Sequence, residues 1–381
     1  MMERRIAAVL AFALGVLPVG TVHGQAPPLV IGLTTPLSGL NAAFGQGLQH
    51  GAQLAVDRAN AAGGVGGRPL QLVSMDDGGT PERAAANATR LLERGAVAIT
   101  GVHGARSATA VAEVLAAVPG GAPLVAPATG AESLRDPPKP GVFHWRAGVA
   151  EEASAAVLHL DTLGVTRFAL VTQSDPLGDS GRERMEFELM RIAMRPAIHE
   201  NLDPGVAPSS VQASMSRVCA IRPEAVILVL DAMLARAAVA AARAQPCAVH
   251  YFVFSETGAA LAVPQADSGA RHPLAGLLVT QVVPHPGNAR HPLVSEYQRA
   301  RAAHGATPGS YPSMEGYLAV RVVQEALRPC GREVSRACLT QSLLSRSFEL
   351  PGMTVQFGQA QRQARPFVEI TLLDGEGRFR R

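Results

Sequence analysis

Charged side chains follow several apolar stretches of this chain, at the points where strands are expected to end. Glu256 and Asp231 each come within two residues of the end of such a stretch, and Arg106 follows another. A pair of carboxylates suits a cationic group, whereas a guanidinium suits a carboxylate. The chemistry that these residue types offer is therefore ionic recognition of charged groups.

Three short motifs offer catalytic, cofactor or metal chemistry instead. The segment Gly178 to Gly181 reads GDSG, like the nucleophile string of serine proteases, but no second glycine follows and the next residues are expected to form a helix. Gly45 to Gly51 imitates a dinucleotide fingerprint, but its last glycine is one residue too far along. Proline follows His272, His285 and His291, as in turns and extended loops. We expect no enzyme activity, no cofactor and no metal.

The elements that position these residues alternate between strands and helices. A strand is predicted from Leu29 to Leu33, a helix from about Ala43 to Ala62, and a second strand from Leu70 to Met75, which together form a βαβ unit. Thr80-Pro81-Glu82 is a typical helix start, with Thr80 as the cap. The alternation predicts an α/β fold of doubly wound parallel sheets. Further strands are expected at Val97 to Thr100, Pro123 to Ala126, Phe143 to Arg146, Arg167 to Thr172, Ala225 to Leu230, His250 to Phe254 and Leu277 to Val282.

The first βαβ unit contains a series of sequence motifs in the order found in a known family. PLSG at residues 36–39, the pair Phe44-Gly45, the run GAQLAVDRANAAGGVGGRPL at residues 51–70 and the pair Asp76-Asp77 follow in order. This order resembles the leucine/isoleucine/valine-binding protein family, the type I solute-binding proteins of ABC importers. The resemblance implies two doubly wound parallel-sheet lobes joined by a three-strand hinge. We place one lobe at residues 27–147 plus 283–353 and the other at 148–282 plus 354–381, with the chain crossing near Ala147 to Val149, Thr280 to Val283 and Met353 to Gln356.

The resemblance also implies where a ligand binds. Parallel sheets bind ligands beyond the carboxyl ends of their strands, and in this family an aromatic ring covers the solute, which places Phe44 there. Two loops hold a ligand carboxylate through hydroxyl and main-chain N–H groups, and Glu256 falls at the position of a glutamate that binds an ammonium. The residues assigned to the ligand site are Phe44, Ala105, Arg106, Ser107, Ala128, Thr129, Gly130, Leu177, Asp231 and Glu256.

Several of these residues depart from the family pattern. Ala105 stands where a serine is expected, and Gly130 stands nearest the expected hydroxyl, so Thr129 is predicted to replace it. Leu177 and Asp231 occupy places where the second lobe often presents tyrosines. These departures weaken any assignment of the ligand as leucine, isoleucine or valine.

Four of the site residues also have a purely structural interpretation. Asp231, just past a strand, could serve only as a helix cap. Arg106 could be a solvated helix residue, Phe44 ordinary core and Glu256 a surface residue. The sequence leaves these alternatives open.

The N-terminus predicts export. Arg4 and Arg5 precede an apolar stretch from Ile6 to Gly20, and small residues follow, so residues 1–24 are interpreted as a cleaved signal peptide. The apolar stretch is too short for a membrane anchor and contains Pro18. Because the first cysteine is Cys219, lipid attachment near the cleavage site is not expected, and we predict a free periplasmic protein.

Composition and cysteine spacing complete the prediction. A net charge of +3 over 381 residues is too small a bias to indicate nucleic-acid binding, and the length favours two domains. Four cysteines in an exported chain allow three connectivities of two disulfides. Short separation favours Cys330 with Cys338, and a shared end of the parallel sheet favours Cys219 with Cys247.

The function expected from the resemblance is solute binding without covalent chemistry. We expect a monomer that binds an amino acid or a related small carboxylate or amide by hinge closure and delivers it to an ABC permease of the branched-chain amino acid type. The alternatives are a periplasmic sensor that presents its closed form to a receptor kinase and, less favoured, a periplasmic hydrolase.

Overall fold

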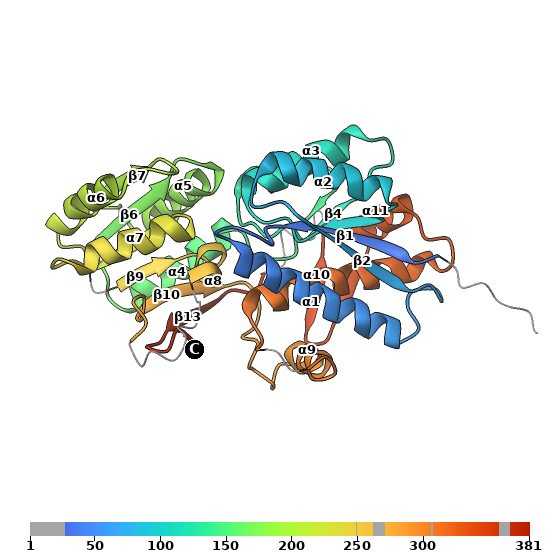
Figure 1. Cartoon of the computed structure of the whole chain (residues 1–381). Helices are drawn as coiled ribbons and strands as arrows, with labels where there is room; N and C mark the ends of the chain where they lie inside the picture. Colours follow the sequence, from blue (N-terminus) through green and yellow to red (C-terminus); the bar gives the residue numbers. More distant parts are fainter. Residues whose placement is uncertain (1–26, 249, 262–270, 306–307, 358–365) are drawn as a thin grey trace, which may run out of the picture.

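The computed structural model describes residues 27–248, 250–261, 271–305, 308–357 and 366–381, so the predicted signal peptide lies outside the described residues. Figure 1 shows two α/β lobes next to each other. Within the described ranges, one lobe contains a five-stranded sheet and the other a seven-stranded sheet. The two-lobed α/β fold confirms the predicted class.

The sheet of the first lobe is parallel throughout, with strand order β2-β1-β3-β4-β5. Its strand β1 reads LVIGLTT and is almost completely buried, as expected for a parallel strand with both faces covered. The register pairs Leu29 of β1 with Leu70 and Ile31 with Ala98. The elements are β1 (Leu29–Thr35), α1 (Ala42–Ala61), β2 (Leu70–Asp76), α2 (Pro81–Glu93), β3 (Ala98–Thr100), α3 (Ala105–Ala117), β4 (Leu124–Val125), the 3-10 turn η1 (Glu132–Leu134) and β5 (Val142–Phe143).

A later part of the chain returns to cover this sheet. Figure 1 shows α10 lying along α1, and residues of both helices share one core with β1. The two helices approach closely, because a Cβ atom at Gly51 would lie 1.7 Å from the carbonyl oxygen of Ser313. This glycine of the Gly45 to Gly51 string therefore serves helix packing. The returning elements are α9 (Pro292–Ala302), α10 (Tyr311–Leu327), η2 (Arg328–Cys330), α11 (Arg336–Ser345), β11 (Ser347–Leu350) and β12 (Met353–Gln356).

The sheet of the second lobe has strand order β14-β13-β10-β9-β8-β6-β7. Its strands β6 to β10 are parallel, and the C-terminal strands β13 and β14 add to the edge in antiparallel orientation. The elements are α4 (Val149–Thr162), β6 (Phe168–Gln173), α5 (Pro176–Arg191), β7 (Ile198–Leu202), α6 (Pro208–Ala220), β8 (Ala225–Val229), α7 (Ala232–Arg243), β9 (His250–Val253), α8 (Ser255–Leu261), β10 (Leu277–Gln281), β13 (Glu369–Leu373) and β14 (Phe379–Arg380).

Helix starts place polar residues at the carboxyl ends of the strands. Asp175 precedes Pro176 and caps α5 by accepting the N–H of Gly178 at 2.8 Å. Asp231 caps α7 in the same way. Thr80 precedes α2 as predicted, but its side chain makes no capping bond.

The chain leaves the first sheet between β5 and α4, returns between β10 and α9, and leaves again between β12 and β13. The predicted strand Phe143 to Arg146 is too long, because β5 ends at Phe143 and the following residues form the first of these passages. Met353 to Gln356 forms β12, whose Val355 packs in the core of the first lobe. The lobe limits given above stay a prediction.

Two disulfides join the four cysteines. Cys219 pairs with Cys247 across 28 residues and Cys330 with Cys338 across 8 residues, with Cα–Cα distances of 4.6 and 6.0 Å. Both predicted pairings are confirmed.

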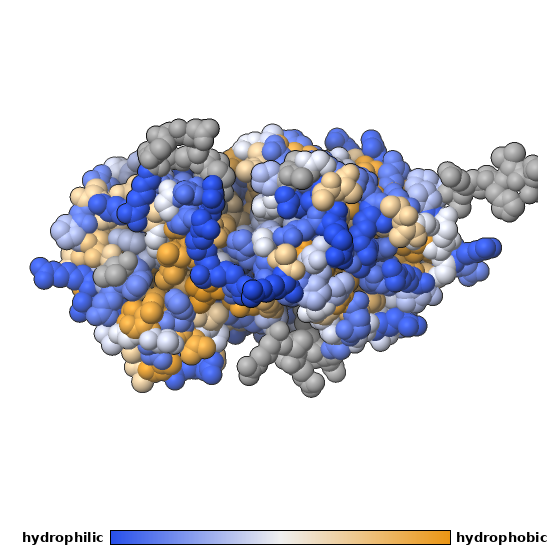
Figure 2. All heavy atoms as spheres, turned by 90° about the horizontal axis from the view of Figure 1, so that it is seen from below, coloured by the Kyte–Doolittle hydropathy of each residue, from blue (hydrophilic) through white to orange (hydrophobic). Residues whose placement is uncertain are grey.

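The surface is mixed in character. Figure 2 shows one face of the molecule, on which hydrophilic and hydrophobic residues are intermixed over both lobes. Among the described helices, none is long and apolar enough to span a membrane.

Candidate ligand-binding site

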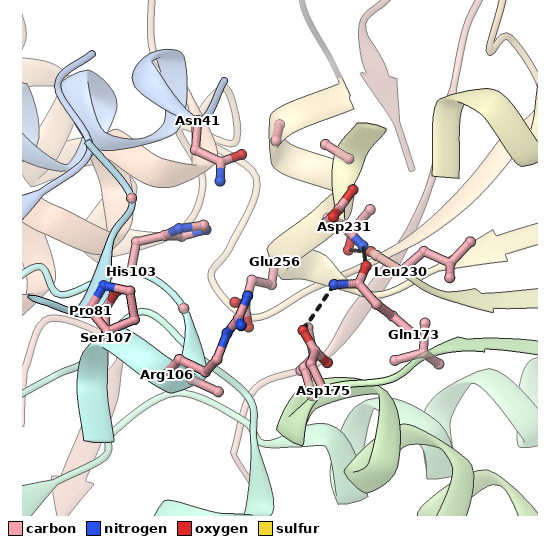
Figure 3. A pocket seen from close by; sticks show the side chains of 18 residues that line it. Asn41, Pro81, His103, Arg106, Ser107, Gln173, Asp175, Leu230, Asp231 and Glu256 are labelled. Atoms are coloured by element: carbon pink, nitrogen blue, oxygen red, sulfur yellow. Dashed lines mark hydrogen bonds between the residues drawn. The ribbon is translucent and has the colours of Figure 1, made fainter. Parts of the chain in front are cut away.

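A pocket of about 170 Å³ opens between the two lobes, at the carboxyl ends of their strands. Figure 3 shows polar side chains from both sides of this pocket directed toward one another. The first lobe contributes Asn41, Gly79, Pro81, His103, Gly104, Ala105, Arg106 and Ser107, and the second lobe contributes Gln173, Asp175, Leu177, Val229, Leu230, Asp231, Ala232, Glu256, Thr257 and Ala260.

Six of the ten residues that the sequence assigned to the site line this pocket. They are Ala105, Arg106, Ser107, Leu177, Asp231 and Glu256. The other four, Phe44, Ala128, Thr129 and Gly130, lie behind the pocket wall and are not among its lining residues. The binding role of each residue stays a prediction.

The ring of His103 lies between Phe44 and the pocket. Phe44 is 1% exposed and stacks on His103, with the ring centroids 4.4 Å apart. Ala128 lies in the same small core and its N–H donates to the Val102 carbonyl at 2.7 Å. Phe44 also lines a neighbouring groove with Met233 of the second lobe. Phe44 and Ala128 therefore belong to the core behind His103, and His103 itself lines the pocket.

Glu256 connects the lobes. It lies in the first turn of α8, is 8% exposed, and its Oε2 accepts the N–H of Gly130 at 3.2 Å. Burial raises the pKa of Glu256 to about 7, against the opposing effects of the Arg146 charge and of hydrogen bonds from Gly130 and Thr129. Thr129 and Gly130 thus act on the pocket through this carboxylate.

Two aspartates of the second lobe are held by the side-chain amide of Gln173, one through its carboxylate and the other through its backbone. The Gln173 side chain donates to Asp175 Oδ2 at 3.0 Å, and its oxygen accepts the Asp231 N–H at 2.9 Å, as the dashed lines in Figure 3 show. Burial raises the pKa of Asp175, while the Gly178 N–H and the Arg106 charge lower it. Both carboxylates cap helices and also line the pocket, so the capping role of Asp231 does not exclude the binding role, which stays a prediction.

The sequence did not assign the other twelve lining residues to the site, among them the polar side chains of His103, Gln173 and Asp175. The Asp175-Pro176 pair is a recognisable helix start, and its position directly after a strand was the available signal. His103 lies between β3 and α3, and neither its residue type nor its spacing distinguishes it from its neighbours in the sequence. Burial and the nearby Arg146 charge lower the pKa of His103 to about 4, so its ring is neutral at neutral pH.

The wall of the first lobe presents a helix N-terminus. Gly104 precedes α3 with φ of 85°, a conformation that favours glycine, and Ala105, Arg106 and Ser107 form the first turn. The leading N–H groups of a helix have no intrahelical acceptors and attract anions. The exposed Arg106 side chain adds a positive charge at the same place.

A buried ionic network lies next to Glu256 in the first passage between the lobes. Arg146 donates to Glu315 of α10 at 3.0 Å and to Ser255 of α8 at 2.6 Å, and it lies 3.7 Å from Glu152 of α4. The side chains of Arg146 and Glu152 are both 1% exposed. The network ties the first lobe to the second through one guanidinium.

The enzyme-like motifs have structural roles. Ser180 of the GDSG string lies inside α5 and donates to the carbonyl of Pro176 at 2.7 Å. No group of three or more His, Cys, Asp or Glu residues that could hold a metal is found within the residues that the structure describes.

The sequence profile described as periplasmic binding protein matches residues 28–372. The chain belongs to the type I periplasmic binding proteins of the leucine/isoleucine/valine-binding protein family, a family of solute-binding proteins and not of enzymes. This confirms the resemblance found in the first βαβ unit.

Individual relatives agree with this assignment. An amino acid binding protein of Pseudomonas aeruginosa is 26% identical over 199 residues, which are 52% of this chain and 52% of that protein. The structure of a possible leucine/isoleucine/valine-binding protein from Rhodopirellula baltica SH 1 is 28% identical with a TM-score of 0.82, over 93% of this chain and 96% of the other. A substrate-binding periplasmic protein from Ralstonia solanacearum is 28% identical with a TM-score of 0.80, over 92% and 99%. The match spans about half the length of the curated relatives.

Proposed function

We propose that this protein is the extracytoplasmic solute-binding component of an ABC importer and takes an amino acid or a related small carboxylate or amide. The observation that carries this proposal is the pocket between the lobes, lined by the N-terminus of α3 on one side and by Glu256 and Asp231 on the other. Relatives named as amino acid binding and Leu/Ile/Val-binding proteins support it.

The two walls suit the two ends of an amino acid. The leading N–H groups of α3 and the guanidinium of Arg106 bind the carboxylate. Glu256 accepts the ammonium from the opposite lobe, and burial of the pair strengthens the interaction. Because each end of the solute contacts a different lobe, the closed state gains contacts that the open state lacks.

Hinge closure follows from this arrangement. The solute shifts the population toward the closed form, which a permease of the branched-chain amino acid type then recognises. The protein works in the periplasm as a monomer after removal of a signal peptide, without a lipid anchor. A second function shares this mechanism: a sensor whose closed form is read by a receptor kinase.

A ligand screen tests the proposal. The secreted chain is screened by thermal shift against amino acids, aromatic acids, amides and dicarboxylates, and hits are measured by calorimetry. A true ligand stabilises the native state by about 2.7 kcal/mol at a hundredfold excess over Kd. Stabilisation by none of these compounds, or turnover of the compound that binds, contradicts the proposal.

A cellular experiment separates the importer from the sensor. Deletion of the chain is expected to abolish uptake of the compound that binds, and restoring the chain is expected to restore it. Unchanged uptake together with a lost transcriptional response to the same compound favours the sensor.

A further inference from the structure

Acidic groups outnumber basic groups on the walls of the pocket between the lobes. Its acidic residues are Asp175, Asp231 and Glu256, and its only arginine is Arg106 among the residues described there. The neutral ring of His103 adds no positive charge. The pocket therefore carries an excess of up to two negative charges before a solute enters.

We propose that the solute is a basic amino acid, whose side-chain cation binds between Asp175 and Asp231 while its carboxylate binds at Arg106 and the first turn of α3. This inference rests on the proposed function, because it concerns the solute of the same pocket. It goes further by assigning the net charge of that solute and the residues that select it.

Gln173 fixes the acidic pair in place. Its amide nitrogen donates to Asp175 Oδ2 at 3.0 Å and its oxygen accepts the Asp231 backbone N–H at 2.9 Å, so one side chain orients the Asp175 carboxylate and holds the backbone of Asp231. Asp231 uses Oδ1 for its helix cap at Leu234, and its Oδ2 has no hydrogen-bond partner within the described chain. Each carboxylate oxygen has two lone pairs, so the pair can accept several N–H donors while the caps stay intact.

The cations near the pocket do not cancel this charge. Arg146 is buried and its charge acts on Glu256, but its guanidinium already faces Glu315 and Glu152. Arg106 has an electrostatic effect on Asp175, yet it forms no salt bridge with a described carboxylate, and no dashed line reaches it in Figure 3. It therefore remains available for the carboxylate of a solute.

An unpaired ring nitrogen on the opposite wall also points to a ligand. His103 lines the pocket, and its buried Nε2 has no hydrogen-bond partner in the part of the chain that the structure describes. A buried polar atom without a partner is unfavourable, and Figure 3 shows the ring directed toward the acidic wall. A polar atom of the solute would satisfy it.

Calorimetry with two matched pairs of compounds tests the assigned charge. L-arginine is compared with L-citrulline, which has a neutral ureido group of nearly the same shape, and L-lysine with L-norleucine. We expect the cationic member of at least one pair to bind tenfold more tightly or better, which corresponds to about 1.4 kcal/mol. Equal or tighter binding of the neutral members, or preferential binding of L-glutamate, overturns the inference but leaves the proposed function standing. Binding of only a carboxylate or amide that is not an amino acid overturns the inference alone, and absence of binding by every compound of the screen overturns both.

Charge-removing variants test the assigned residues. Asparagine caps helices about as well as aspartate, so Asp175→Asn and Asp231→Asn remove the charge and keep the caps. In the double variant the preference for arginine over citrulline is expected to fall at least tenfold with little change in melting temperature. Asp161→Asn, an exposed position on α4, is the control and should keep the preference. A double variant that retains the full preference overturns the assignment.

Discussion

Glu256 Oε2 accepts the backbone N–H of Gly130 at 3.2 Å, and this contact joins α8 of the second lobe to the loop after β4 of the first. Next to it, Arg146 bonds Ser255, the residue before Glu256, and Glu315 of the first lobe. Glu256 in the wall of the pocket and Arg146 in the passage between the lobes are therefore connected through neighbouring residues. A change in the charge of Glu256 is expected to affect both stability and binding.

The first prediction concerns stability and pH. The pKa of Glu256 rises from 4.5 to about 7 on folding, so the native state keeps a proton that the unfolded chain has lost. Stability from this group is fully present below pH 4.5 and is lost as the pH rises toward 7. The loss is on the order of 3 kcal/mol at most. Urea unfolding at pH 5 and pH 8 is expected to show a smaller pH-dependent loss for Glu256→Gln than for the wild type, and parallel profiles contradict the raised pKa.

The second prediction concerns binding and pH. A solute cation at Glu256 requires the ionised carboxylate, so affinity in the wild type is expected to increase between pH 6 and pH 8. Glu256→Gln should bind more weakly at pH 8 by roughly 1.5 to 3 kcal/mol, the contribution of a hydrogen bond to a charged group, and its affinity should vary less with pH. Calorimetry with the best compound of the screen measures both. Unchanged affinity of the variant removes Glu256 from the site.

The sequence predicted the parallel cores well and the sheet edges poorly. Strands such as Ala225–Val229 are continuous apolar runs. Such a run can be recognised from the local sequence, without knowledge of how the strands pair. The unpredicted strand Ile198–Leu202 reads IHENL, and only Leu202 is buried. Its strand state depends on pairing with β6, which a local pattern does not contain. The same holds for the antiparallel strands at the C-terminus.

Family positions led to six residues that line the pocket and to four that do not, whereas lining residues with an ordinary local role were not assigned. The binding roles stay predictions. Asp175 and Gln173 were missed because a helix cap and a strand end explain them without a pocket. Phe44 was expected over the solute, yet it contacts His103 one layer behind. Only the arrangement of the two lobes distinguishes a side chain that lines the pocket from one that supports it.

The third prediction concerns the buried network. Arg146→Met leaves Glu152 and Glu315 buried without their cation, so unfolding free energy is expected to fall by about 3 to 5 kcal/mol. Arg191→Met is the matched control, because Arg191 pairs with Glu188 at 2.9 Å but its side chain is 60% exposed; it should cost less than about 1 kcal/mol. Denaturant unfolding compares the two. Equal losses contradict the role of the network.

The fourth prediction ranks the disulfides. The separation of 28 residues between Cys219 and Cys247 is larger than the 8 residues between Cys330 and Cys338, and the chain-entropy model assigns them about 3.5 and about 2.5 kcal/mol. The double variant Cys219→Ala/Cys247→Ala is therefore expected to lose more stability than Cys330→Ala/Cys338→Ala. Peptide mapping of the secreted protein should show the same two pairs. Free thiols or crossed pairs contradict this pairing.

The fifth prediction uses the single tryptophan of the chain. Trp145 lies between β5 and α4, is 8% exposed, and is followed by Arg146, which contacts both lobes. Lobe closure should therefore change the surroundings of the indole even though the indole does not line the pocket. We expect a saturable shift of Trp145 emission on titration of the ligand-stripped protein, with micromolar affinity, about −8 kcal/mol.

Two comparisons make this fluorescence titration decisive. Glu256→Gln at the same solute concentration should show a reduced shift, because less solute is bound and fewer molecules close. Asp161→Asn, whose exposed side chain is remote from the described lining of the pocket, should titrate like the wild type. Small-angle scattering reports the compaction that closure predicts. If calorimetry shows binding while Trp145 emission and scattering both stay constant, the solute binds without hinge closure, and the passage between β5 and α4 does not move with the lobes.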